Sequence, residues 1–280
     1  MATRPKEKEI IKALAAKLGK HGMPTVHFLG RVFPAAFRVS VQDIPPVKWE
    51  QPEVGLQMEF QLHIKDSAVD VECVVNRFSR DDLASIWTRA FDLARAAVDL
   101  VSFSRGWGLL VVFETFVDPN GASSQWATSD ASLPPLCTSF GPGDASGGNF
   151  SKLIVILLQE PSLFMALNDL IAANTFPHCC PTNCGRVLDS IRNMVTPPTA
   201  NASVKQSWEA LRTNLRAERE YLQLVTDLST GPRHGDRTHI PGPLTTEILK
   251  RTWIIMDRFL EFRKRGSQPL PESEFPVLAP

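Results

Sequence analysis

The side chains best suited to chemistry gather in one short polar stretch near the C-terminus, between residues 231 and 243. Its chemically active residues are Arg233, His234, Asp236, Arg237 and His239. A histidine titrates near neutral pH and can accept or donate a proton. An arginine presents a fixed fork of donors to a phosphate group. The stretch is therefore the first candidate for proton transfer and phosphate binding.

The same residues have a structural interpretation. The glycines and prolines between residues 231 and 242 predict an irregular backbone. Arg233, His234 and Asp236 would then tie the loop down through side-chain hydrogen bonds and cap the helix ends. Both interpretations stay open at the level of sequence.

A long amphipathic helix follows, from about Gly242 to Arg265. Proline at its first turn costs no hydrogen bond, and steps of about 100° separate an apolar face from a charged one. The charged face carries Lys250, Arg251, Asp257, Arg258, Glu261, Lys264 and Arg265. We expect this face to be solvated, with cations near the C-terminal end that complement the helix dipole, or to bind an anionic partner.

The region from residue 151 to 266 is predicted to be a helical bundle. Pro161 opens one helix, Thr182 caps a second, and Ser203 with Gln206 forms a capping box before a third. With the last helix this predicts a four-helix arrangement, in which short connections imply antiparallel neighbours. The apolar run 153–158 is ambiguous between strand and helix.

Residues 1–120 predict a small α+β domain with an antiparallel or mixed sheet. The segments 56–65 and 69–75 alternate apolar and polar residues and predict a hairpin. The period becomes 3.6 between residues 81 and 103, which predicts a helix that covers the hairpin. Residues 109–117 are apolar on both faces and predict a central strand.

The remaining N-terminal segments are less regular. A short helix is expected at 5–18 and strands at 26–33 and 36–41, before the proline-bearing stretch 43–52 interrupts the pattern. His63 lies on the polar face of its strand, where a solvated histidine is the expected role.

Ser, Gly, Pro and Asp dominate residues 121–150, which we interpret as a flexible connector. Its glycines do not form a phosphate loop, because the Gly-Lys-Ser/Thr ending is missing. A tail of residues 267–280 follows the bundle.

Composition limits the possible classes of protein. The formal net charge is zero, which argues against bulk electrostatic binding of nucleic acid. No segment approaches the roughly 20 apolar residues of a membrane span, so no membrane association is expected. The five cysteines fit a reducing compartment, and a cytoplasmic protein is predicted.

One cluster contains metal-ligand types: His178, Cys179, Cys180 and Cys184. No second cysteine pair follows at zinc-ribbon spacing. Small buried side chains at the start of a helix are therefore the preferred interpretation, and neither a metal nor another cofactor is expected.

The helical half resembles the HEPN domains, small bundles of which many are metal-independent ribonucleases. Their motif is an arginine, a polar residue and a short run that ends in histidine near the start of the last helix. Arg233, His234 and His239 match it, although the family usually places the pair on helical backbone. A second alignment sets His234 and Gly235 on the closing His-Gly, which leaves no arginine upstream and implies an inactive domain.

The resemblance implies an RNA-cleaving or RNA-binding module, with the N-terminal half sensing or recruiting. His239 would exchange a proton with the 2′-hydroxyl or the leaving oxygen, and Arg233 would stabilise the phosphate. His234, Asp236 and Arg237 would support the site or bind phosphate. The resemblance also implies a homodimer. The alternative is a catalytically inert interaction protein that dimerises through the bundle.

Overall fold

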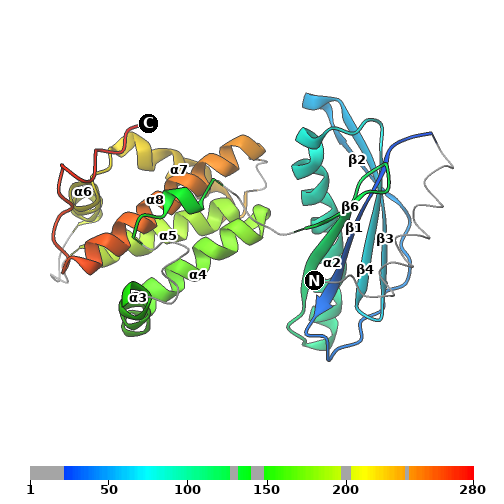
Figure 1. Ribbon diagram of the computed structural model, residues 1–280, viewed down its shortest axis with the longest axis horizontal. Coiled ribbons are helices and arrows are strands. Elements are labelled where there is room, and N and C mark those ends of the chain that lie inside the picture. Colours follow the sequence, from blue (N-terminus) through cyan, green and yellow to red (C-terminus); the bar gives the residue numbers. More distant parts are fainter. Residues whose placement is uncertain (1–21, 127–131, 140–147, 197–202, 237–239) are drawn as a thin grey trace. The chain divides into compact units, whose positions relative to one another are not determined.

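The computed structural model describes residues 22–126, 132–139, 148–196, 203–236 and 240–280. The chain divides into two compact units, Met1–Ala127 and Thr128–Pro280. The first contains a sheet and a long helix, and the second contains helices (Figure 1). This confirms the α+β fold class. The helix predicted at 5–18 lies outside the described residues.

The N-terminal unit contains an antiparallel six-stranded sheet in the order β2-β3-β4-β1-β5-β6. Its strands are β1 (Thr25–Phe33), β2 (Val47–Gln51), β3 (Leu56–Lys65), β4 (Ala68–Val75), β5 (Leu110–Val117) and β6 (Ser123–Gln125). β3 and β4 form the predicted hairpin, with Phe60 opposite Cys73 and Leu62 opposite Val71. These four side chains are buried, because alternate residues of paired strands share one face.

Helix α2 (Leu83–Arg105) lies along that apolar face of the sheet (Figure 1). Its buried side chains include Ile86, Ala90 and Ala94, which follow the predicted helical spacing. Aromatic rings fill the space between helix and sheet, and the ring centroids of Phe28 and Phe113 lie 5.5 Å apart. The period of two residues in the strands and the period of 3.6 residues in α2 therefore predicted that α2 packs closely on the sheet.

Three details of the sheet differ from expectation. The prediction of a strand over 36–41 is wrong, since that segment contributes only an isolated bridge between Val41 and Ile64. The proline-bearing stretch 43–52 instead contains β2, at the edge of the sheet where nearby prolines interrupt no ladder. β5 has only the three-residue β6 on its outer side, so it lies next to the edge.

The C-terminal unit is built from helices joined by short connections. They are α3 (Gly148–Gln159), α4 (Pro161–Thr175), α5 (Cys180–Val195), α6 (Val204–Leu215), α7 (Arg219–Arg233) and α8 (Gly242–Lys264). The capping box of Ser203 and Gln206 is present. The ambiguous run 153–158 is helical. Arg216 adopts a left-handed conformation (φ 54°) and separates α6 from α7.

Helix α8 runs through the middle of this unit (Figure 1). Ile248, Ile255 and Phe259 on its apolar side are fully buried. Its charged side is also covered, since Asp257 and Arg258 are only 5% and 6% exposed. The expectation of a solvated charged face is therefore wrong for this part of α8, because two chain segments lie over it.

The covering segments come from the stretches that composition predicts as connector and tail. Leu133 is 2% exposed and packs in the core of the helical unit. From the tail, Leu270 is buried, and Phe275 and Leu278 pack against the same core. Leu278 also pairs with the backbone of Ala217 as an isolated bridge. Both segments thus contribute to the hydrophobic core of the unit.

Candidate functional site

The predicted loop is shorter in the structure than in the sequence interpretation. Gly231, Pro232 and Arg233 form the last turn of α7, and the backbone N–H of His234 is shared between the carbonyls of Thr230 and Gly231, at 3.2 and 2.9 Å. Pro232 removes one backbone donor, yet α7 continues through it to Arg233. Arg233 therefore lies on helical backbone.

The guanidinium of Arg233 forms an ion pair with the carboxylate of Asp189 on α5. The side chains are 26% and 35% exposed, so the pair is partly shielded from solvent. Asp189 also contacts Arg192 at 3.4 Å. Arg233 thus joins α7 to α5, and binding a phosphate would require it to leave or share this carboxylate.

The two helices approach closely beside this pair. A Cβ built on Gly185 of α5 would lie 2.4 Å from the hydroxyl of Ser229 and 3.4 Å from the guanidinium carbon of Arg233. Glycine is therefore required for this contact. Within the described part of the chain, the buried Nε of Arg233 has no hydrogen-bond partner. The arginine is held by packing and by one carboxylate.

The other residues of the predicted site are only partly visible. His234 and Asp236 are exposed beyond the end of α7, and the Asp236 N–H donates to the Gly231 carbonyl at 3.0 Å. Arg237 and His239 lie outside the described residues. The pairing of Arg233 with His239 stays a prediction.

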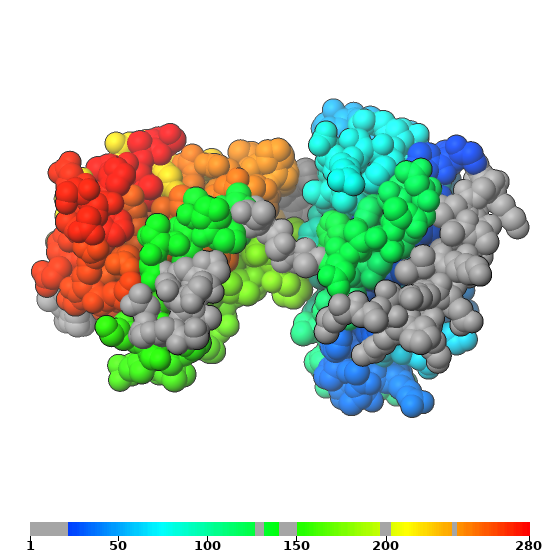
Figure 2. Space-filling view, in the orientation of Figure 1, coloured from blue at the N-terminus to red at the C-terminus, as the bar shows by residue number. Residues whose placement is uncertain are grey.

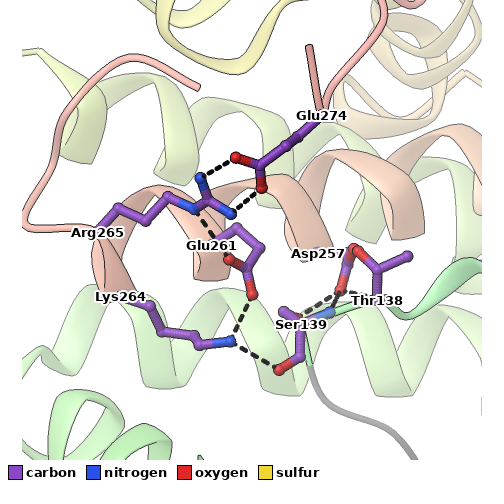
Figure 3. A network of polar contacts seen from close by, with 7 residues as sticks. All are labelled: Thr138, Ser139, Asp257, Glu261, Lys264, Arg265 and Glu274. Atoms are coloured by element: carbon purple, nitrogen blue, oxygen red, sulfur yellow. Dashed lines mark hydrogen bonds and ion pairs between the residues drawn. The ribbon is translucent and has the colours of Figure 1, made fainter. Parts of the chain in front are cut away.

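The acidic and basic groups at the end of α8 form a network within the unit (Figure 3). Lys264 donates to Glu261 and, at 3.0 Å, to the carbonyl of Ser139. Arg265 donates to both carboxylate oxygens of Glu274 in the tail and to Glu261. The hydrogen bond from Arg265 lowers the pKa of Glu274. These cations are engaged with the protein's own carboxylates.

Arg258 has a related role one turn earlier. Its guanidinium donates to the carbonyls of Leu215 and Arg216 at 2.9 and 2.8 Å and to that of Pro276 at 2.7 Å. Arg258 therefore satisfies orphan carbonyls at the end of α6 and fixes the tail beside them. The basic residues of α8 thus act mainly as structural connections.

The cysteine cluster begins helix α5. The sulfurs of Cys180 and Cys184 lie 3.8 Å apart, and both side chains are buried. The hydrogen bond to Cys184 and burial raise the pKa of Cys180, so this thiol is protonated, and its sulfur also lies 3.7 Å from the Thr245 carbonyl oxygen. Among the described residues, no group of three or more His, Cys, Asp and Glu side chains is placed to hold a metal ion.

An apolar surface on α3 and α4 is a feature that the sequence interpretation missed. Its exposed side chains are Phe150, Ile154, Val155, Leu158, Phe164, Met165 and Ile171. The signal in the sequence was the apolar run 153–158, which has too many apolar residues for a helix with one buried face.

In the N-terminal unit, the structure also pairs the buried His27 with Asp70 at 3.0 Å, across adjacent strands.

Two domain families match the chain. Residues 26–126 match the DUF8168 N-terminal domain and residues 150–264 match the DUF8168 C-terminal domain, both described as domains of unknown function. The chain belongs to the DUF8168 family, with one domain in each compact unit. No curated protein and no solved structure matches it.

The hydropathy of the described helices shows whether any of them could cross a membrane. None is both long and apolar enough to cross a membrane by itself, although Phe150–Gln159 and Pro161–Thr175 pass the test as a pair bent by 111°. These are the segments that carry the exposed apolar surface.

Proposed function

We propose that the protein is a catalytically inert interaction protein that associates with itself through its helical unit. The observation that carries this proposal is the set of exposed apolar side chains on α3 and α4, among which Leu158 is 73% exposed. Full burial of such a side chain is worth about 1.5–3 kcal/mol, and the part of each side chain that stays exposed forgoes the corresponding share. A protein partner would recover part of it.

The position of α8 bears on which surface is available for the proposed self-association. The sequence predicts dimerisation through the bundle, and the apolar residues of its last helix fill the core of the unit. Among its large apolar side chains, Leu244 at the N-terminal end is the exposed one in the described residues. Among the described residues of the helical unit, most of the exposed large apolar side chains are on α3 and α4.

A HEPN-like ribonuclease is the second candidate. It is favoured by the helical backbone of Arg233, since the HEPN pair usually lies on a helix, and by the exposure of His234 and Asp236. It is disfavoured by the Asp189 carboxylate, which neutralises the guanidinium that would stabilise the phosphate. No metal takes part in either candidate, and the cysteines fit a cytoplasmic setting.

Two measurements on the full chain test the proposal. Sedimentation equilibrium at micromolar concentrations should give a dimeric mass, and a monomeric mass throughout would contradict self-association. Incubation with single-stranded RNA and a chelator should leave the RNA intact. Cleavage that disappears in both Arg233→Ala and His239→Ala, but persists in a His63→Ala control, would support the ribonuclease instead.

A further inference from the structure

Helix α3 carries a stripe of exposed apolar side chains. Phe150, Ile154 and Leu158 recur every four residues and are 40%, 38% and 73% exposed. Residues at this spacing lie on one side of a helix. Leu153, on another side, is buried and anchors α3 to the unit. The stripe therefore faces away from the core and forms a surface that another helix can contact.

The exposed area is close to what an interface requires. Seven apolar side chains of α3 and α4 are roughly half exposed. A phenylalanine side chain presents on the order of 150–250 Å² and the smaller aliphatic side chains present less, so the seven half-exposed side chains present on the order of 500 Å². This is a large part of the apolar area within the roughly 800 Å² that each partner buries in a standard interface. Figure 2 shows atoms of α3 and α4, in green and yellow-green, at the surface of the helical unit.

The charge on these helices indicates which occupant fits. Lys152 is the charged residue of α3, and Asp169 of α4 is paired with Arg186 at 3.1 Å. A helix that lies on a membrane usually has a polar face rich in Lys and Arg, which α3 and α4 lack. Charge-depleted apolar contacts are typical of homodimer interfaces, and two such surfaces meet without like-charge repulsion.

We propose that the partner is a second copy of this chain, which contacts α3 by its own α3 in antiparallel orientation about a two-fold axis. This inference rests on the proposed function. A two-fold axis brings the same patch of both copies together. Ile154, in the middle of the stripe, then faces Ile154 of the second copy, and Phe150 faces Leu158.

Single charge substitutions in the full chain test the surface. Ile154→Lys and Leu158→Glu should each raise the dimer dissociation constant at least about 30-fold, as expected for a central side chain of an interface. Val204→Glu on α6 is the matched control, because Val204 is 65% exposed in the same unit. It should leave the constant unchanged. Far-UV circular dichroism should show an intact fold for all three variants.

A charge pair tests the orientation. Phe150→Lys and Leu158→Glu should each weaken the dimer, whereas the chain with both changes should recover it, because antiparallel helices place each new lysine opposite a new glutamate. Likewise, Ile154→Lys and Ile154→Glu should form a mixed dimer when combined. Failure of both recoveries would overturn the antiparallel contact.

The outcomes separate this inference from the proposed function. A monomeric wild-type chain would remove both. A wild-type dimer that tolerates every α3 substitution would overturn the inference and leave self-association in place through another surface. Sedimentation of the wild-type chain with phosphatidylserine-containing vesicles, lost in Leu158→Glu, would overturn the inference in favour of a lipid surface.

Discussion

The carboxylate of Asp257 on α8 accepts a hydrogen bond from the backbone N–H of Ser139 at 2.8 Å, although 118 positions separate the two residues. The Ser139 hydroxyl and both donors of Thr138 bond to the same carboxylate. Asp257 thus accepts the hydrogen bonds at the end of the segment that contains Thr138 and Ser139, which crosses the charged side of α8. This buried carboxylate is an organising contact of the helical unit, and it gives the first prediction.

Asp257→Asn should lower the free energy of unfolding by about 1–3 kcal/mol. An asparagine amide places its own donors where a carboxylate accepts, so buried donors of Thr138 and Ser139 lose their partner. Urea unfolding followed by circular dichroism measures the change. Asp227→Asn, at an exposed position of α7, is the control and should stay within about 0.5 kcal/mol of wild type. Equal stability of the two variants would contradict the role of Asp257.

A chain that ends at Gly266 should be less stable by about 3 kcal/mol or more. It loses the buried Leu270 side chain, which alone contributes about 1.5–3 kcal/mol. It also loses the Pro276 carbonyl that accepts from Arg258. Differential scanning calorimetry should show a lower transition temperature for the helical unit. An unchanged transition would mean that the tail is dispensable and would contradict its role in the core.

Gly185→Ala should destabilise the contact between α5 and α7 by about 1–3 kcal/mol. The added Cβ would lie 2.6 Å from the Cβ of Ser229, so the helices must separate, and overpacking of this kind costs that amount. Chemical unfolding measures the loss. Gln223→Ala on the exposed side of α7 is the control and should change little. A variant as stable as wild type would show that the two helices separate freely.

Tyr221→Phe should remove part of the loss of stability at alkaline pH. Burial raises the pKa of Tyr221 to about 12 from its ordinary 10.0. The unfolded chain therefore loses this proton first, and the free energy of unfolding falls as pH rises from about 10 to about 12. Phenylalanine has no proton to lose, so the variant should fall less over that interval. Parallel urea titrations at pH 9 and 11 provide the comparison.

The same substitution has an expected result at neutral pH. In the described part of the chain the Tyr221 hydroxyl is buried without a hydrogen-bond partner. Its removal should therefore leave stability unchanged or slightly higher. A loss above about 1 kcal/mol at pH 7 would indicate that the hydroxyl is bonded.

Local patterns predicted much of the fold. The alternation in β3 and β4, the 3.6 period of α2 and the capping box of Ser203 and Gln206 all depend on neighbours a few residues apart. These elements were therefore readable from the sequence. The edge strand β2 was not, because Pro45, Pro46 and Pro52 flank its five residues and prolines indicate an interruption of a strand pattern.

The surroundings of Arg233 could not be predicted from local sequence patterns. Glycine and proline near Arg233 predict a loop, yet Gly231 and Pro232 lie within the last turn of α7, which α5 contacts at Ser229 and Arg233. The sequence placed Arg233 near the last helix, but the Asp189 carboxylate that binds it lies 44 residues away. Its engagement could not be predicted from spacing alone.

The sequence by itself determined the α+β class, the existence of two parts and the amphipathic character of the last helix, because these follow from composition and short-range periodicity. Only the tertiary structure decided which surfaces meet water. The charged side of α8 is buried because residues 138–139 and the tail supply partners for its ions, whereas the apolar stripe of α3 stays exposed because that helix packs through Leu153. Burial is a property of long-range packing, so a helix's own pattern shows its two faces but not which segment covers each.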